Sequence, residues 1–204
     1  MQNIKAIIFD LGGVLLDIDY NKASGAFKKL GVSDFDSMYS QAGANPLFQH
    51  LETGKIDQQH FCNAMMQYIP GTKRREDIIA AWNAMLLDFR KDSLEELKRL
   101  RGKYKLYLLS NTNFIHLQAF NKIYEETIGG TPFIDLFDKV YWSHELGLRK
   151  PDANSYEAVL NDNNLRPEET LFIDDTLQNI EGAKRLGLHT IYLKKGMTIE
   201  GLGL

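Results

Sequence analysis

The sequence predicts an α/β fold in which a parallel sheet is combined with an all-helical segment inserted after the first strand. Three observations support this prediction. A mostly apolar run at residues 4–9 has the pattern of a buried strand, residues 20–90 have a helical pattern throughout, and strand-like and helix-like segments alternate from about residue 92. Strands that alternate with helices imply right-handed crossovers, and such crossovers make the strands parallel in one sheet.

The composition is that of an ordinary globular protein. Of the 204 residues, 44% are apolar and 25% are charged, which is enough for a sizeable core in one domain with an insertion. The net charge of −3, without a long basic stripe, argues against nucleic acid as the main partner. We expect no signal peptide and no membrane span. The one cysteine, Cys62, excludes an internal disulfide and suits a cytoplasmic protein.

The first predicted strand ends at a carboxylate. Its residues, Ile4 to Phe9, are mostly apolar and rich in β-branched side chains, which predicts burial on both faces of the sheet. Asp10 follows directly, and ligands of parallel sheets bind outside the carboxyl ends of the strands. Gly12 and Gly13 come next, and glycines let a ligand approach main-chain N–H groups, which favours an anion such as phosphate.

The segment from residue 20 to residue 90 has the apolar spacing of helices. Ala23, Phe27 and Leu30 mark one helix, and Gly31 suits its end. Further helices are marked by Phe61, Met65 and Met66 behind the candidate N-cap Asp57, and by Trp82, Met85 and Leu86. An all-helical insertion at this point would lie over the carboxyl edge of the sheet as a cap near Asp10.

The rest of the chain alternates between the two patterns. The predicted elements are helix 93–101, strand 105–109, helix 114–126, strand 139–142, helix 153–161, strand 170–174, helix 179–186 and strand 190–193. Because the carboxyl ends of parallel strands share one edge, polar residues that follow these strands are candidates for the same site.

Two polar segments at this edge are individually ambiguous. Residues 110–113, Ser-Asn-Thr-Asn, lead from a strand into a helix, where hydroxyl, amide and main-chain donors can hold an anion, although Ser and Asn are also common helix caps. Lys150 precedes Pro151, which fixes the chain ahead of a helix and can direct the ammonium group back towards the strand ends. The alternative for Lys150 is a solvated loop lysine.

Asp174 and Asp175 end the predicted strand 170–174 and would join Asp10 at the edge. Like charges about 4 Å apart repel by roughly 1 kcal/mol in water and by more in a half-buried site, so the group needs a cation or protons. An oxygen-only cluster with an open position suits Mg²⁺, which retains waters and recruits a substrate phosphate. The simpler alternative is that Asp174 and Asp175 are turn residues before the next helix.

The chain resembles the haloacid dehalogenase superfamily of hydrolases over nearly its whole length. Four segments are similar to the four motifs of that family, in the family's order: Phe9-Asp10-Leu11-Gly12-Gly13-Val14-Leu15, Leu109-Ser110-Asn111, Arg149-Lys150-Pro151-Asp152, and Phe172-Ile173-Asp174-Asp175 with Asn179-Ile180-Glu181-Gly182-Ala183. The resemblance implies a Rossmann-like catalytic core at residues 1–16 and 91–204, with a helical cap at residues 17–90.

The resemblance also implies roles for individual residues. Asp10 would be the nucleophile that forms an aspartyl-phosphate, while Ser110 and Lys150 would hold the phosphoryl group. Covalent catalysis of this kind divides one hard displacement into two easier steps. From the residues themselves, Gly13 and Asn111 are further candidates for substrate binding.

The implied cofactor is Mg²⁺. Its ligands would be Asp10, the main-chain carbonyl of Gly12 and Asp175, with Asp174 in support. The metal and the lysine would together stabilise the charge of the phosphoryl group.

One position departs from the pattern of the family's phosphatases. They usually carry a second aspartate two residues after the nucleophile, which protonates the leaving group, but here that position is Gly12. A general acid–base group typically contributes about 10² to 10⁴ in rate. Asp17 and Asp19 are candidate substitutes, or else ordinary turn acids. A subgroup that resembles bacterial glucose-1-phosphatase-like proteins has a similar Asp-Leu-Gly opening and retains phosphatase activity.

Three functions remain open from the sequence. The leading one is a Mg²⁺-dependent phosphomonoesterase acting on a small metabolite such as a sugar phosphate, because a helical cap limits substrate size. A 2-haloacid dehalogenase would use Asp10 against carbon without a metal, but the pair Asp174 and Asp175 argues against it. A catalytically impaired member that binds a phosphorylated ligand or a protein partner is kept open by Gly12. The sequence does not indicate the oligomeric state.

Three cap residues are candidates for contact with a substrate. Glu52, Lys55 and His60 lie in or near the predicted inter-helix turn 52–56. The alternative for each is an ordinary surface residue.

Overall fold

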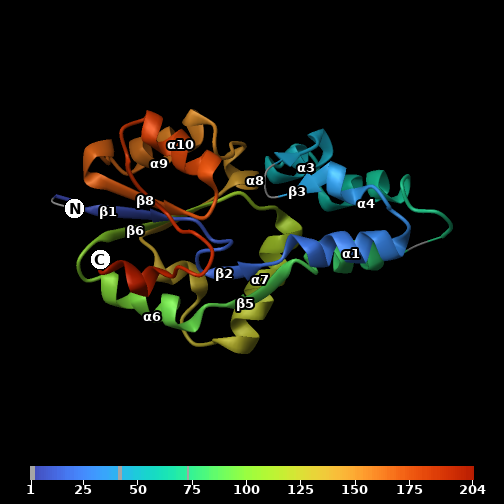
Figure 1. Cartoon of the computed structure of the whole chain (residues 1–204), viewed down its shortest axis with the longest axis horizontal. Helices are drawn as coiled ribbons and strands as arrows, with labels where there is room; N and C mark the ends of the chain where they lie inside the picture. Colours follow the sequence, from blue (N-terminus) through green and yellow to red (C-terminus); the bar gives the residue numbers. More distant parts are fainter. Residues whose placement is uncertain (1–2, 41–42, 73) are drawn as a thin grey trace.

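A five-stranded parallel sheet forms the centre of the molecule (Figure 1). The computed structural model describes residues 3–40, 43–72 and 74–204. The strand order is β7-β6-β1-β8-β9, and every neighbouring pair is parallel. The strands are β1 (Ala6–Phe9), β6 (Lys105–Ser110), β7 (Lys139–Trp142), β8 (Thr170–Asp174) and β9 (His189–Tyr192). The predicted α/β fold with a parallel sheet is therefore confirmed.

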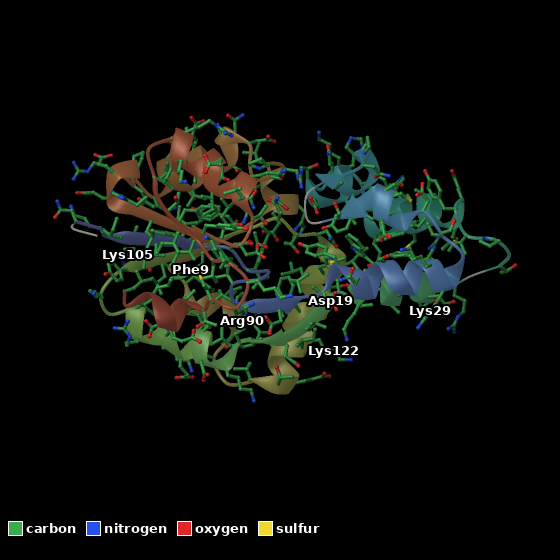
Figure 2. All side chains as sticks on the ribbon, in the orientation of Figure 1. Phe9, Asp19, Lys29, Arg90, Lys105 and Lys122 are labelled. Carbon is green, nitrogen blue, oxygen red and sulfur yellow. The ribbon has the colours of Figure 1, made fainter. Side chains whose placement is uncertain are left out.

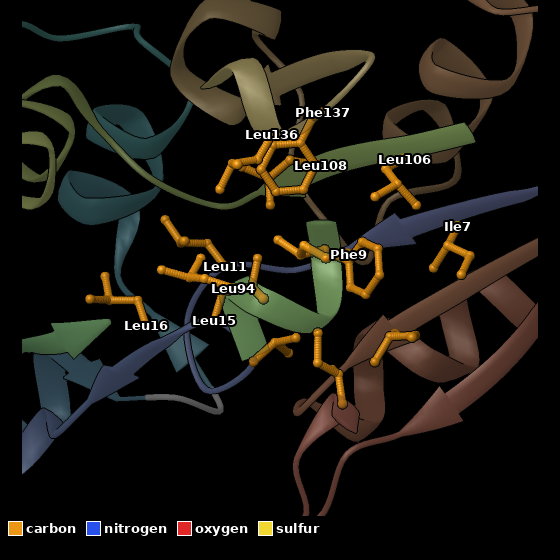
Figure 3. Packing of buried hydrophobic residues seen from close by; sticks show 14 of the residues in the cluster. Ile7, Phe9, Leu11, Leu15, Leu16, Leu94, Leu106, Leu108, Leu136 and Phe137 are labelled. Atoms are coloured by element: carbon orange, nitrogen blue, oxygen red, sulfur yellow. The ribbon is translucent and has the colours of Figure 1, made fainter. Parts of the chain in front are cut away.

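Helices cover both faces of the sheet, which explains the apolar run that precedes Asp10. Ile7 and Phe9 pack into one buried cluster, and Ala6 and Ile8 pack into another on the opposite face. Figure 3 shows the first cluster, where Phe9 lies among leucines of neighbouring elements. The covering helices are α6 (Lys91–Leu100) and α7 (Phe114–Thr127) on the first face, and α9 (Ala153–Asp162) and α10 (Leu177–Arg185) on the second.

The central strand β1 fixes where the candidate site residues lie. Phe9 is in register with Leu108 of β6 and with Ile173 of β8. The main-chain N–H of Asp10 donates to the carbonyl of Ile173 at 2.9 Å. The residues that follow β1, β6 and β8 therefore meet at one edge, as the sequence predicts.

The inserted segment builds a helical unit around its own apolar cluster, at the right of Figure 1. Its helices are α1 (Tyr20–Leu30), α2 (Phe35–Met38), α3 (Pro46–Glu52), α4 (Gln58–Met66) and α5 (Arg75–Asn83). Gly31 ends α1 with φ 108°, and Asp57 caps α4, as predicted. Cys62 is a buried member of the cluster. That residues 17–90 act as a cap on a core of 1–16 and 91–204 stays a prediction.

The prediction of helix throughout residues 20–90 is wrong at several points. The helix marked by Trp82 and Leu86 ends at Asn83, and the chain then forms β5 (Leu86–Phe89), which pairs antiparallel with β2 (Leu16–Ile18). A second short pair joins β3 (Tyr39–Ser40) and β4 (Gly43–Ala44). The β2–β5 pair forms because the chain enters and leaves the helical unit at the same place, so the two crossings lie side by side.

The remaining elements are short. They are α8 (Ser143–Leu146) and the 3₁₀ turns η1 (Phe133–Leu136), η2 (Pro167–Glu169) and η3 (Ile199–Leu202). Among the described helices, none has the length and apolar character needed to cross a membrane.

The turn between α3 and α4 packs closely against α8. Gly54 has φ +65°, and a β-carbon there would overlap the main-chain carbonyl of His144. Gly71 has a similar φ of +75° but no neighbouring atom within 4 Å of such a carbon. The two glycines therefore share one conformational requirement and differ only in close packing.

We expect Gly54→Ala to destabilise the protein more than Gly71→Ala. Both variants place an alanine in the left-handed region, at about 1 to 2 kcal/mol each. Gly54→Ala must also move the turn away from His144, so we expect a further loss on the order of 1 kcal/mol or more. Urea unfolding of both variants measures the difference. Equal losses would show that this turn does not hold the helical unit against α8.

Candidate active site

Three carboxylates converge at the carboxyl edge of the sheet. Asp10 follows β1, Asp174 ends β8 and Asp175 comes next in the chain. One oxygen from each carboxylate lies within 4.8 Å of the other two. The adjacency of β1 and β8 in the sheet produces this cluster, and Ser110, at the end of β6, is buried beside it in the same cavity.

Lys150 is buried among these carboxylates rather than solvated. Its side chain is 1% exposed, and Nζ lies 2.7 Å from Oδ1 of Asp10 and 2.8 Å from Oδ2 of Asp174. A lysine is rarely buried so fully unless its charge is paired. The solvated alternative for Lys150 is therefore wrong.

Asn111 holds the main chain of Lys150 in place. Its Oδ1 accepts from the Lys150 N–H at 2.9 Å, and its Nδ2 donates to the Lys150 carbonyl at 2.8 Å. Asn111 borders the cavity, but its amide group is engaged with the protein. Asn111 therefore positions Lys150, and its predicted part in substrate binding stays a prediction.

Burial and mutual repulsion shift the titration of the cluster. Burial raises the pKa of Asp10 to about 7, with Lys150 opposing the shift and Asp174 adding to it. Burial, followed by Asp174, raises the pKa of Asp175 to about 6. Burial alone would lower the pKa of Lys150, but Asp10 and Asp174 raise it above its usual value. A cation beside Asp10 and Asp175 would favour the ionised form of both.

Asp174 is fully buried, and donors from the protein occupy both of its carboxylate oxygens. Its Oδ1 accepts from the Thr176 N–H at 2.7 Å, and its Oδ2 accepts from Asn179 Nδ2 at 3.0 Å in addition to Lys150. Asn179 lies in the fourth motif, but no pattern in the sequence predicts its contact with Asp174. Because protein donors occupy both oxygens, Asp174 is placed to position Lys150.

Gly13 takes a different part from the one expected. Its N–H donates to the carbonyl of Leu16 at 2.8 Å, and Gly13 is not among the described residues that line the cavity. Its φ is +70°, and a β-carbon would overlap the carboxylate of Asp175. The expectation that the Gly13 N–H faces a ligand is corrected: Gly13 makes room for Asp175, and Gly12 borders the cavity.

A cavity of about 280 Å³ lies between the sheet edge and the helical unit. Further polar and apolar side chains line this cavity beside the carboxylates, Ser110 and Lys150. The polar side chains include Tyr20, Tyr39, Gln49, Glu52 and Arg149, and the apolar ones Leu16, Ile18, Met85, Leu86 and Phe120. Of the three cap candidates, Glu52 lines the cavity, whereas Lys55 and His60 do not, and His60 pairs with Asp57.

Glu52 is buried and forms an ion pair with the half-buried Arg149, and this pair links the helical unit to the turn holding Lys150. Arg149 Nη2 and Nε lie 2.9 and 3.0 Å from Oε2 of Glu52, and the Tyr39 hydroxyl donates to Oε1 at 3.1 Å. Burial raises the pKa of Glu52, and Arg149 partly offsets this. Sequence reasoning missed this pair, because its members are 97 residues apart.

Neither sequence candidate for the missing acid reaches the cavity. Asp19 caps α1 by accepting from the Asn21 N–H at 3.0 Å, and Asp17 pairs with Arg90 at 2.7 Å. Figure 2 labels Asp19 and Arg90 near the junction between the helical unit and the rest of the molecule. Both aspartates are absent from the described lining of the cavity. Asp17 and Asp19 therefore do not stand in for an acid at Gly12.

Comparison with known proteins places the whole arrangement in a family. Residues 4–187 match the model for haloacid dehalogenase-like hydrolases (HAD). The chain is 36% identical over 194 residues to D-ribitol-5-phosphate phosphatase of Bacteroides thetaiotaomicron, covering 95% of this chain and 93% of that protein.

Two solved structures are similar over nearly the full length. A HAD family enzyme of Bacteroides thetaiotaomicron, an aspartate-to-alanine variant in complex with magnesium and inorganic phosphate, has a TM-score of 0.92 at 33% identity and covers 98% of this chain and 99% of its own. A HAD-like family hydrolase of Porphyromonas gingivalis has a TM-score of 0.88 at 32% identity, with 98% and 97% covered.

We expect Arg149→Met to destabilise the protein in a pH-dependent manner. The variant leaves the buried Glu52 carboxylate without its cation, so we expect the free energy of unfolding to fall by about 3 kcal/mol near pH 8. A carboxyl group whose pKa is higher in the folded state destabilises that state only once pH rises above the unfolded pKa. The loss should therefore be smaller at pH 5 than at pH 8, because more of the Glu52 carboxyl is protonated at the lower pH.

The matched control is Arg166→Met. Arg166 also pairs with a glutamate, but its side chain is 62% exposed, so we expect a much smaller loss than for Arg149→Met at either pH. Urea unfolding at both pH values measures the two variants. A loss for Arg149→Met that is the same at both pH values would contradict the assignment of Glu52 as the unpaired group.

Proposed function

We propose that this chain, which belongs to the haloacid dehalogenase-like hydrolases, is a Mg²⁺-dependent phosphomonoesterase acting on a small phosphorylated metabolite. The observation that carries the proposal is the cluster of three carboxylates around the buried ammonium of Lys150, at the floor of a cavity. An all-oxygen donor set fits Mg²⁺, and an ammonium group beside it fits a phosphoryl group. The phosphatase and the magnesium and phosphate complex among the relatives support the same reading.

The proposed roles follow from these positions. A carboxylate oxygen of Asp10 attacks phosphorus, so that an Asp10–phosphorus bond forms while the ester bond to the leaving alcohol breaks. Water then hydrolyses the aspartyl-phosphate. Lys150 and Ser110 hold the phosphoryl oxygens. The side chain of Asn111 keeps Lys150 in position by bonding to the main chain of Lys150.

The proposed metal ligands are Asp10, the main-chain carbonyl of Gly12 and Asp175. Asp174 supports them by fixing Lys150. When bound, Mg²⁺ supplies positive charge that neutralises the phosphoryl oxygens during transfer.

The proposed substrate class is a sugar or polyol phosphate. Tyrosine, amide, glutamate and arginine side chains line the cavity, and such groups bind hydroxyls. The relative from Bacteroides thetaiotaomicron is named for a polyol phosphate. The Asp-Leu-Gly opening at residues 10–12 also supports placement in the subgroup that resembles glucose-1-phosphatases. We propose a cytoplasmic location from the single buried Cys62, with neither nucleic acid nor membrane as partner.

The other two functions fit the site less well. A metal-free dehalogenase would have to place an anionic substrate beside Asp174 and Asp175, which repel anions. An impaired binding protein would not need a buried lysine aligned on the nucleophile. Gly12 still distinguishes this chain from the family's usual phosphatases.

The experiment that tests the proposal is metal removal. Excess EDTA should abolish hydrolysis of nitrophenyl phosphate, and Mg²⁺ should restore it. Asp175→Asn should raise the Mg²⁺ concentration needed for half-maximal rate by about tenfold or more, because a ligand charge is lost. Asp17→Asn is the control and should leave that concentration unchanged, because Asp17 lies outside the cavity. Undiminished turnover in EDTA would contradict the proposal and favour the dehalogenase.

Gly12 generates a second prediction, about the leaving group. Without a positioned acid the alcohol departs unprotonated, so turnover should depend steeply on its acidity, with nitrophenyl phosphate cleaved much faster than alkyl phosphates. Gly12→Asp should flatten this dependence if the side chain fits. A β-carbon at Gly12 would lie 3.1 Å from Cγ1 of Ile18, so Ile18 must shift slightly. A flat dependence in the wild type would show that another acid is already in place.

A further inference from the structure

His116 is buried in the cavity wall and has no role in the proposed reaction. It lies in the first turn of α7, is 6% exposed, and lines the cavity together with Phe120, one helical turn further along. Both side chains therefore come from the cavity-facing side of α7.

The ring of His116 is held in one orientation. It stacks on Trp82 with ring centroids 4.6 Å apart and an interplanar angle of 21°. Its Nδ1 lies 2.9 Å from Oδ1 of Asn83. Since an amide oxygen only accepts hydrogen bonds, Nδ1 carries the proton and Nε2 of the neutral ring presents a lone pair. Burial lowers the pKa of His116 to about 3, so the ring is neutral at physiological pH.

Nε2 of His116 is buried and has no hydrogen-bond partner within residues 3–40, 43–72 and 74–204. The same cavity is lined by the apolar side chains of Leu16, Ile18, Leu86 and Phe120. A buried acceptor without a donor costs about 1 to 3 kcal/mol. In a cavity that opens onto the nucleophile, a ligand can supply the missing donor.

We propose that His116 is a specificity-determining residue whose Nε2 accepts a hydrogen bond from a hydroxyl of the leaving alcohol, other than the ester oxygen. This inference rests on the proposed function and narrows its substrates to phosphate esters of polyhydroxylated alcohols. An alkyl phosphate of the same length leaves Nε2 unpaired. Because Nε2 carries no proton, His116 does not replace the acid missing at Gly12.

Binding without turnover tests the inference. In an Asp10→Asn background with Mg²⁺, calorimetry compares ribitol 5-phosphate with pentyl phosphate, which has the same chain length and no free hydroxyl. His116→Phe keeps a ring against Trp82 but removes the acceptor. This variant should bind ribitol 5-phosphate about tenfold more weakly, and its affinity for pentyl phosphate should change by less than about twofold. His60→Phe, at an exposed histidine outside the cavity, is the control and should change neither.

The possible outcomes separate this inference from the proposed function. Equal weakening of both esters, as a bound water or a structural role for the ring would give, overturns the inference and leaves the phosphatase intact. Unchanged binding of ribitol 5-phosphate also overturns the inference. Binding of neither ester in the Asp10→Asn background contradicts the inference and the proposed function together.

A spectroscopic measurement leaves the His116 side chain itself unchanged. In the ¹⁵N-histidine NMR spectrum of the wild-type protein, Nε2 of His116 should resonate as an unprotonated nitrogen from near pH 5 to near pH 8. In the Asp10→Asn protein with Mg²⁺, which does not turn the esters over, this resonance should move when ribitol 5-phosphate binds and not when pentyl phosphate binds. A proton on Nε2 in the free protein would overturn the inference.

Discussion

The ammonium group of Lys150 lies between the carboxylates of Asp10 and Asp174, and the rest of the site is arranged around this contact. An unpaired charge at this depth would cost several kcal/mol, so the lysine and the carboxylates depend on one another. The parallel sheet makes the contact possible, because β1 and β8 are neighbours and end at the same level. Asn111 and Asn179 then fix the two sides of the contact, one through the main chain of Lys150 and the other through Asp174.

The turn that contains Arg149 and Lys150 joins the acidic edge of the sheet to the helical unit. Arg149 precedes Lys150 and pairs with Glu52 of α3, so an ion pair adjacent in sequence to the central lysine lines the cavity. On the other side, His116 of α7 stacks on Trp82 of α5. Residues that would contact the leaving alcohol therefore come from both halves of the chain, while those that would contact phosphate come from the sheet edge.

The sheet and its acidic edge could be predicted from the sequence because both rest on local patterns. The apolar run before Asp10 and the pair Asp174 and Asp175 each stand at the end of a buried strand, and strand ends meet in a parallel sheet. The β2–β5 pair could not be predicted, because it depends on the chain leaving the helical unit where it entered. The partners of Asn111 and Glu52 were also beyond prediction, because each is set by long-range packing rather than by a local pattern.

If Asp10 is the nucleophile held by Lys150, a phosphoryl group is bound covalently to it during turnover, and trapping this intermediate is the direct test. Wild-type protein quenched in acid during turnover of a ³²P-labelled phosphate ester should carry the label, and peptide mapping should place it on Asp10. Asp10→Asn should carry none while remaining folded. Label on Ser110, or an equal amount of label on the Asp10→Asn protein, would contradict the account.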